Sequence, residues 1–211
     1  MIRALRLLRA SLSAWYYDLF VLIAVNIVWL VLSILILPLG PATAGLFHVC
    51  NELAKGEPIS FGLFWVGMKR HAGLSAKLAA VIVILSILLV VNLNFYLDLR
   101  SSIGQIIAIV WVYAIIAWGA ILNFPFALLV QMEKPGLIKI IRNSALLVLD
   151  NVAFSFSMSI LTLLLIGLSI FPLGLLPMPF GFFTLLAIFQ CKCLAMLMEK
   201  YEKKEQQTGS A

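Results

Sequence analysis

The stretch Leu37-Pro38-Leu39-Gly40-Pro41-Ala42-Thr43-Ala44-Gly45 separates a long apolar run from a short run that carries polar side chains. Proline lacks a backbone donor and glycine relaxes the backbone, so the first helix is predicted to end here. Pro41 suits the first turn of the following helix, where its missing N–H costs nothing. We predict that this second helix covers residues 42–54, and it contains His48, Asn51 and Glu52. The junction therefore predicts a helical hairpin whose second arm is unusually polar.

The composition excludes a soluble globular domain. Of the 211 residues, 64% are hydrophobic and only 11% are charged, whereas soluble domains carry about 25% charged residues. The sequence therefore predicts an all-α, multi-pass membrane protein with a single helical domain over residues 1–200. The net charge is +6, but the basic residues cluster beside the apolar runs. That pattern favours contact with anionic lipid headgroups over nucleic-acid binding.

Hydropathy predicts five transmembrane helices, together with shorter amphipathic ones. The spans are expected at about 18–37, 74–97, 103–131, 152–171 and 180–198, with Pro125 kinking the third. Basic helices at 1–16, 60–71 and 137–149 are expected to lie in the headgroup plane. Residues 172–179 are predicted to form an uncharged turn, and 201–211 a disordered cytoplasmic tail.

The distribution of charge constrains the topology. Lysine and arginine gather around residues 55–77, around 134–142 and at the C-terminal end, which predicts that these regions are cytoplasmic. Three arginines place the N-terminus on the same side. Residues 42–54 must then return towards the cytoplasm, although 13 residues reach only about 20 Å. We expect a short spanning or re-entrant helix that surrounding protein shields from lipid.

The same pattern suggests three hairpin units. They would cover residues 1–54, 57–134 and 135–200, each with a basic interfacial helix, a helix outward and a helix back. Pro-Leu-Gly occurs at residues 38–40 and again at 172–174, where two of the outward turns would fall. A true internal repeat is one interpretation of this match, and chance agreement between apolar sequences is the other.

One candidate functional cluster lies in the short helix. His48 and Glu52 are four residues apart and share a face, with Asn51 beside them. Such a cluster could bind a metal or relay protons, because ionisable groups within a membrane are functional candidates. It could equally be a hydrogen-bonded structural cluster at the wet end of the helix. Since no second histidine is expected nearby, we predict no metal site and no cofactor.

The motif Gly40, Pro41, Ala42, Thr43 and Ala44 also allows two interpretations. Its small residues could expose backbone for close helix packing. The free N–H groups of the helix start could instead hold an anion. No cationic side chain lies nearby in the sequence, which favours packing.

Several amides fall inside the predicted spans or at their ends, namely Asn26, Asn92, Asn94 and Asn123. They could line a polar pathway or form hydrogen bonds between helices. The sequence contains no Ser/His/Asp set, metalloprotease motif, catalytic carboxylate pair or phosphate-binding loop. We therefore predict no catalytic residues and a protein that is not an enzyme.

From Asn26 to Leu97 the chain resembles the YesL-like integral membrane proteins, a family without an assigned function. The resemblance rests on the Gly40–Ala44 motif, Leu46-Phe47, Gly56-Glu57, Phe64-Trp65 and Asn94-Phe95-Tyr96-Leu97. Members often accompany carbohydrate uptake loci with ABC-type transporters in bacteria. Many carry a charged segment after the Gly-Glu pair, whereas residues 58–67 here are uncharged.

The resemblance implies an accessory or scaffold protein of the bacterial inner membrane, with ABC-type sugar transporter subunits as possible partners and self-association as the other option. The charge pattern adds two expectations, which are cytoplasmic N- and C-termini and contact with anionic lipids. The alternative is a small-solute transporter or channel, with a polar path lined by the first hairpin and the third span.

Overall fold

The computed structural model describes residues 2–35, 38–99, 101–170 and 181–208. Within these ranges the chain forms nine helices and no strand. Their bounds are α1 (Ile2–Tyr17), α2 (Leu19–Ile34), α3 (Leu39–Lys55), α4 (Phe61–Asp98), α5 (Ser102–Ile121), α6 (Pro125–Gln131), α7 (Leu137–Asp150), α8 (Val152–Ile170) and α9 (Phe182–Thr208). The predicted all-α class is confirmed. The predicted turn at 172–179 lies outside the described residues.

Two sharp elbows organise the chain. The axes of α1 and α2 differ by 96°, and those of α7 and α8 by 107°. Asp18 separates the first pair, and the backbone of Asn151 leaves helical geometry between the second pair. A basic helix that turns through a right angle into an apolar one is the arrangement predicted for an interfacial helix followed by a span.

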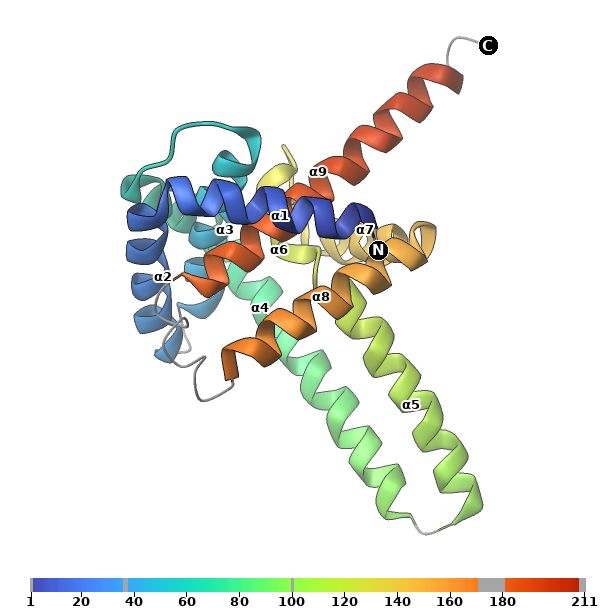
Figure 1. Cartoon of the computed structure of the whole chain (residues 1–211). Coiled ribbons are helices and arrows are strands. Elements are labelled where there is room, and N and C mark those ends of the chain that lie inside the picture. The colour runs from blue at the N-terminus through green and yellow to red at the C-terminus, as the bar shows by residue number, and fades with distance from the viewer. Residues whose placement is uncertain (1, 36–37, 100, 171–180, 209–211) are drawn as a thin grey trace.

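Helix α1 presents three different faces. Leu7, Leu8, Ala14 and Trp15 pack against the core. Leu5, Leu12 and Tyr16 form an exposed apolar face, and Arg6 and Arg9 an exposed basic one. The sequence predicted only two faces. The third exists because α1 crosses α9 and packs on it, as Figure 1 shows.

Helix α3 is the centre of the fold. Eleven of its 17 residues are buried, and it packs against α4, α9, α2 and α6. The helix starts at Leu39, three residues earlier than expected, since Pro41 fits within its first turn. Gly56 ends it in the left-handed conformation, with a φ of 84°. The predicted protein shield around this polar helix is therefore present.

Helix α4 corrects the prediction of two separate helices at 60–71 and 74–97. It is one helix of 38 residues, about 57 Å long. Ala72 and Leu74 favour helix, and the intervening Gly73 is exposed and tolerated there. Twenty uncharged residues separate Lys77 from Asp98, which is about 30 Å, the thickness of a bilayer core.

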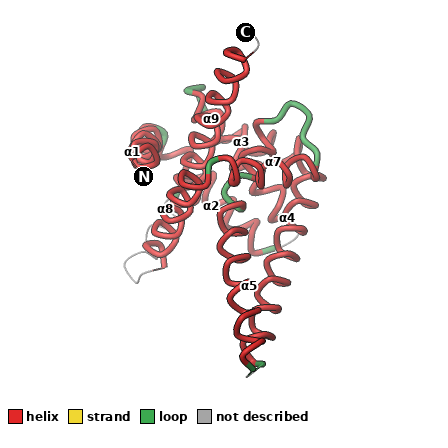
Figure 2. The backbone as a smooth tube through the Cα atoms, turned by 90° about the vertical axis from the view of Figure 1, so that its right-hand side faces the viewer, coloured by secondary structure: helices red, strands yellow, loops and turns green. Residues whose placement is uncertain are grey.

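Helices α4 and α5 form a hairpin that projects from the rest of the molecule (Figures 1 and 2). In the most apolar 18-residue window of each, only 11% of residues are buried. The predicted kink in the third span is a full break, because α5 ends at Ile121 and α6 begins at Pro125. Residues 56–60 and 132–136 lie at the opposite end of the molecule from the α4–α5 turn.

Helix α9 joins distant parts of the chain. Trp15 Nε1 donates to the carbonyl oxygen of Gly181 at 3.0 Å, and Lys192 Nζ donates to that of Ala10 at 2.9 Å. Gly181 has a φ of 108°, and a Cβ there would lie 3.0 Å from Trp15 Nε1. The helix continues to Thr208, through most of the tail expected to be disordered from residue 201. Tyr201 helps to extend it, because its hydroxyl donates to Asp150 Oδ2 at 3.1 Å.

Three described segments are long and apolar enough to cross a membrane alone, namely α4, Ser102–Gln131 and Phe182–Glu202. The two elbow pairs, α1–α2 and α7–α8, satisfy the same criteria when each is taken together. This gives up to five spans by length and composition, which agrees with the five predicted. Helix α2 alone has 16 residues, so it needs its elbow partner to qualify.

Candidate functional site

The predicted polar cluster lies at the C-terminal end of α3. His48 and Asn51 are buried, with 9% and 1% of their surfaces exposed. Glu52 is half-buried and forms an ion pair with Lys55 at 3.0 Å. Burial lowers the pKa of His48, and the positive charges of Arg70 and Lys55 oppose the raising effect of Glu52. The cluster is thus partly neutralised and hydrogen-bonded.

The structure adds a second histidine to this cluster. His71 from α4 places its ring 6.3 Å from that of His48, centroid to centroid, in a tilted arrangement. Gly67 allows this approach, because a Cβ there would collide with the Cβ of His48. The sequence analysis expected no second histidine nearby, because the two are 23 positions apart in sequence. Among the described residues, no group of three or more His, Cys, Asp or Glu side chains is placed to hold a metal ion.

The small residues of the Gly40–Ala44 motif bring α3 and α4 into direct contact. A Cβ on Gly40 would collide with the carbonyl oxygen of Ser75 and would lie 2.8 Å from Ala76 Cα. A Cβ on Gly45 would lie 2.6 Å from the carbonyl oxygen of Phe64. Ala42 and Ala44 are fully buried. The packing interpretation of the motif accounts for these contacts.

Among the four candidate amides, the structure brings Asn123 into a network between helices. Its Nδ2 donates to Ser159 Oγ at 3.1 Å, and its Oδ1 accepts from Thr162 Oγ1 at 2.9 Å and Gln190 Nε2 at 3.2 Å. This network joins the α5–α6 break to α8 and α9. The sequence analysis did not identify Ser159, Thr162 or Gln190, because isolated Ser, Thr and Gln residues are common in apolar helices.

Two of the other amides bond within their own helix. Asn92 and Asn94 donate to carbonyl oxygens of their own helix, at 2.7 and 2.8 Å. Both lie in the part of α4 that projects from the bundle. Asn26 is fully buried in α2.

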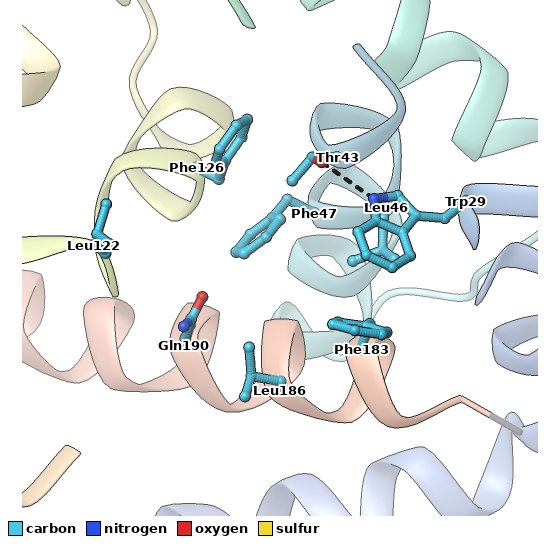
Figure 3. Close-up of a pocket in the computed structure, with 9 residues that line it drawn as sticks. All are labelled: Trp29, Thr43, Leu46, Phe47, Leu122, Phe126, Phe183, Leu186 and Gln190. Carbon is cyan, nitrogen blue, oxygen red and sulfur yellow. Dashed lines mark hydrogen bonds between the residues drawn. The ribbon is translucent and has the colours of Figure 1, made fainter. Parts of the chain in front are cut away.

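A cavity of about 200 Å³ lies between the first hairpin, the α5–α6 break and α9. Figure 3 shows its lining residues, which are Trp29, Thr43, Leu46, Phe47, Leu122, Phe126, Phe183, Leu186 and Gln190. Trp29 packs on Phe183 with ring centroids 4.4 Å apart, and Phe47 on Phe126 at 5.7 Å. None of these lining residues is charged. The place predicted for a polar path therefore holds an aromatic cavity with few polar atoms.

The fold defines this chain as a helical membrane-type protein built around a buried central helix. A family model described as "Protein of unknown function, DUF624" matches residues 22–93. The match covers most of α2, all of α3 and most of α4, so it includes the close contact between α3 and α4. No curated protein and no solved structure matches the chain. The family description assigns no activity.

Proposed function

We propose that this chain is a non-enzymatic multi-pass protein of the bacterial inner membrane that acts as an accessory or scaffold component of carbohydrate or solute uptake. The observation that supports a scaffold is the projecting part of the α4–α5 hairpin, which lies beyond the segment of α4 that packs in the core through Phe64 and Leu78. Its exposed apolar side chains include Ile84, Ile87, Val91, Ile106, Ile109 and Val110. The link to carbohydrate uptake rests on the YesL-like resemblance of residues 26–97.

The hairpin is the surface that we propose for partners within the membrane. A photo-reactive amino acid at Ile109, which is 56% exposed, should crosslink to a membrane subunit of an ABC-type transporter or to a second copy of the chain. The same group at Ile188, which is fully buried, serves as the matched control. Adducts formed with lipid alone at Ile109 would contradict the scaffold role.

We also propose that both termini and residues 56–60 face the cytoplasm. Basic residues gather around residues 55–77 and 134–142 and at the C-terminal end, whereas Arg100 is the one basic residue of the sequence between the ends of α4 and α5. A cysteine introduced at Gly56 should react with a membrane-impermeant reagent only in inverted vesicles. A cysteine at Ser102 should react only from the periplasmic side. Reaction of both from one side would overturn this topology.

The alternative function is a small-solute transporter or channel. Its predicted path coincides with the aromatic cavity, which offers few polar groups for an ion or a sugar to follow. Liposomes that contain the purified protein should therefore show no protein-dependent flux of sugars or ions. Robust flux would overturn the accessory role and favour transport.

A further inference from the structure

We propose that the aromatic cavity binds a small uncharged ring-shaped molecule of the phenol class, whose hydroxyl donates a hydrogen bond to Gln190 Oε1. This site does not depend on the scaffold role, and it gives the chain a ligand that its family description does not name.

The size and shape of the cavity fit a single ring. It is partly open, and its volume of about 200 Å³ is similar to that of the enclosed cavities of about 150 Å³ that bind benzene in protein cores. The faces and edges of Trp29, Phe47, Phe126 and Phe183 line it, drawn together from α2, α3, α6 and α9 (Figure 3). Aromatic walls favour a planar guest, because offset and edge-on ring contacts add stabilisation to apolar burial.

The polar atom that faces this cavity has a fixed orientation. Gln190 is 5% exposed, and its Nε2 donates to Asn123 Oδ1 at 3.2 Å. Ser159 and Thr162 hold Asn123 in turn, so the Gln190 amide has little freedom to flip. Its oxygen points towards the rings of Phe47 and Phe126 (Figure 3) and accepts no hydrogen bond from the described residues. An amide oxygen that lines an apolar cavity favours a guest that brings a donor.

The remaining polar atoms of the cavity already bond to one another. Trp29 Nε1 donates to Thr43 Oγ1 at 3.1 Å, and Thr43 Oγ1 donates to the carbonyl oxygen of Leu39 at 2.7 Å. A free sugar would bury several hydroxyls against a single available acceptor, which is unfavourable. An ion would find no countercharge among the lining residues. A molecule with one ring and one hydroxyl group therefore matches the aromatic lining of the cavity and its one available acceptor, Gln190 Oε1.

Such a ring could come from two sources, a free phenol or the phenolic headgroup of a membrane lipid. The probes are therefore phenol, toluene as its counterpart without a hydroxyl, and a phenol that carries a long alkyl chain. Binding is measured by calorimetry and by thermal shift on the full chain in nanodiscs. We expect phenol to bind about fivefold more tightly than toluene, which is the effect of one hydrogen bond of about 1 kcal/mol.

Variants separate a specific site from simple partition into lipid. Gln190→Leu keeps the cavity apolar and should remove the preference for phenol, while Asn123 still accepts from Thr162. Leu122→Trp should fill the cavity and abolish binding of both small probes. Gln131→Leu, whose side chain contacts Cys191 away from the cavity, is the matched control and should bind like the parent.

Two results would overturn the proposal. One is equal binding of phenol and toluene to the parent protein, and the other is an unchanged preference for phenol in Gln190→Leu. Loss of all binding in Gln131→Leu would also overturn it, because the site would then not be local. Tighter binding of the alkyl phenol than of phenol in the parent, lost in Leu122→Trp, would identify a lipid headgroup as the source. Equal binding of the two would identify a free phenol.

Discussion

The contact between Gly40 and α4 makes a specific prediction for Gly40→Ala. The added methyl group would collide with the carbonyl oxygen of Ser75 and would lie 2.8 Å from Ala76 Cα. Both obstacles are backbone atoms in the middle of a helix, so no side chain can rotate away to make room. The two helices must therefore separate at this point.

The size of the effect follows from these distances. Carbon atoms normally approach to about 3.5–4.0 Å, so the helices must move apart by about 0.7–1.2 Å. Overpacking of this kind costs about 1–3 kcal/mol, and the better helix propensity of alanine returns about 0.5–1 kcal/mol. We expect a net loss of up to about 2.5 kcal/mol in the free energy of unfolding. For a chain of this length, that lowers Tm by up to about 10 °C.

Thermal unfolding in detergent, followed by circular dichroism, measures the change. Gly73→Ala is the matched control, because a Cβ there meets no heavy atom within 4 Å. That control should gain about 0.5–1 kcal/mol from helix propensity alone. The two substitutions are chemically identical, and the expected shifts have opposite signs. If Gly40→Ala is as stable as Gly73→Ala, the close α3–α4 contact is wrong.

Three further predictions concern polar groups. Asn123→Leu should lower the free energy of unfolding by about 1–3 kcal/mol, because three partner side chains lose a hydrogen bond. Asn92→Leu on the projecting hairpin is the control and should be nearly neutral. Equal losses of Tm in the two variants would contradict this. Burial lowers the pKa of His48, so the unfolded chain takes up protons more readily as pH falls below about 6.5. Stability should therefore decrease as the pH falls from 7.5 to 5.5, and Tm should fall less over that range in His48→Gln than in the parent protein. An identical dependence of Tm on pH in the two proteins would refute the role of His48. Tyr201→Phe removes the hydrogen bonds to Asp150 and Asn151, so it should lower the free energy of unfolding by about 1 kcal/mol and reduce Tm accordingly. An unchanged Tm would show that these bonds do not stabilise the fold.

Much of the fold was predictable from local chemistry. The proline and glycine of the junction locate the start of α3, and Asn123 with Pro125 locates the break between α5 and α6. Charge and hydropathy together predict the elbow after α1 and the one after α7. These features depend on a few neighbouring residues, which is why sequence patterns identify them. The continuous α4 was not predicted, because a glycine among charged residues also fits the end of a helix.

The site was less predictable, because it depends on contacts between distant segments. His71 joins His48 only through the packing of α3 on α4, and Gln190 meets Asn123 across 67 positions of sequence. No local pattern distinguishes Gln190 from Gln131, although only Gln190 faces the aromatic cavity. The four-residue spacing of His48 and Glu52 was visible, but their partners were not.

The bonds between α1 and α9 also bear on how the chain folds during synthesis. The partner of Trp15 lies 166 residues later, and that of Ala10 lies 182 residues later. At about 5–20 residues per second, the ribosome needs on the order of 10–30 s to make this interval. Helix α1 must therefore wait at the membrane surface, with the face that binds α9 uncovered, until α9 emerges. The α4–α5 hairpin can assemble during that delay, because its two arms are neighbours in sequence.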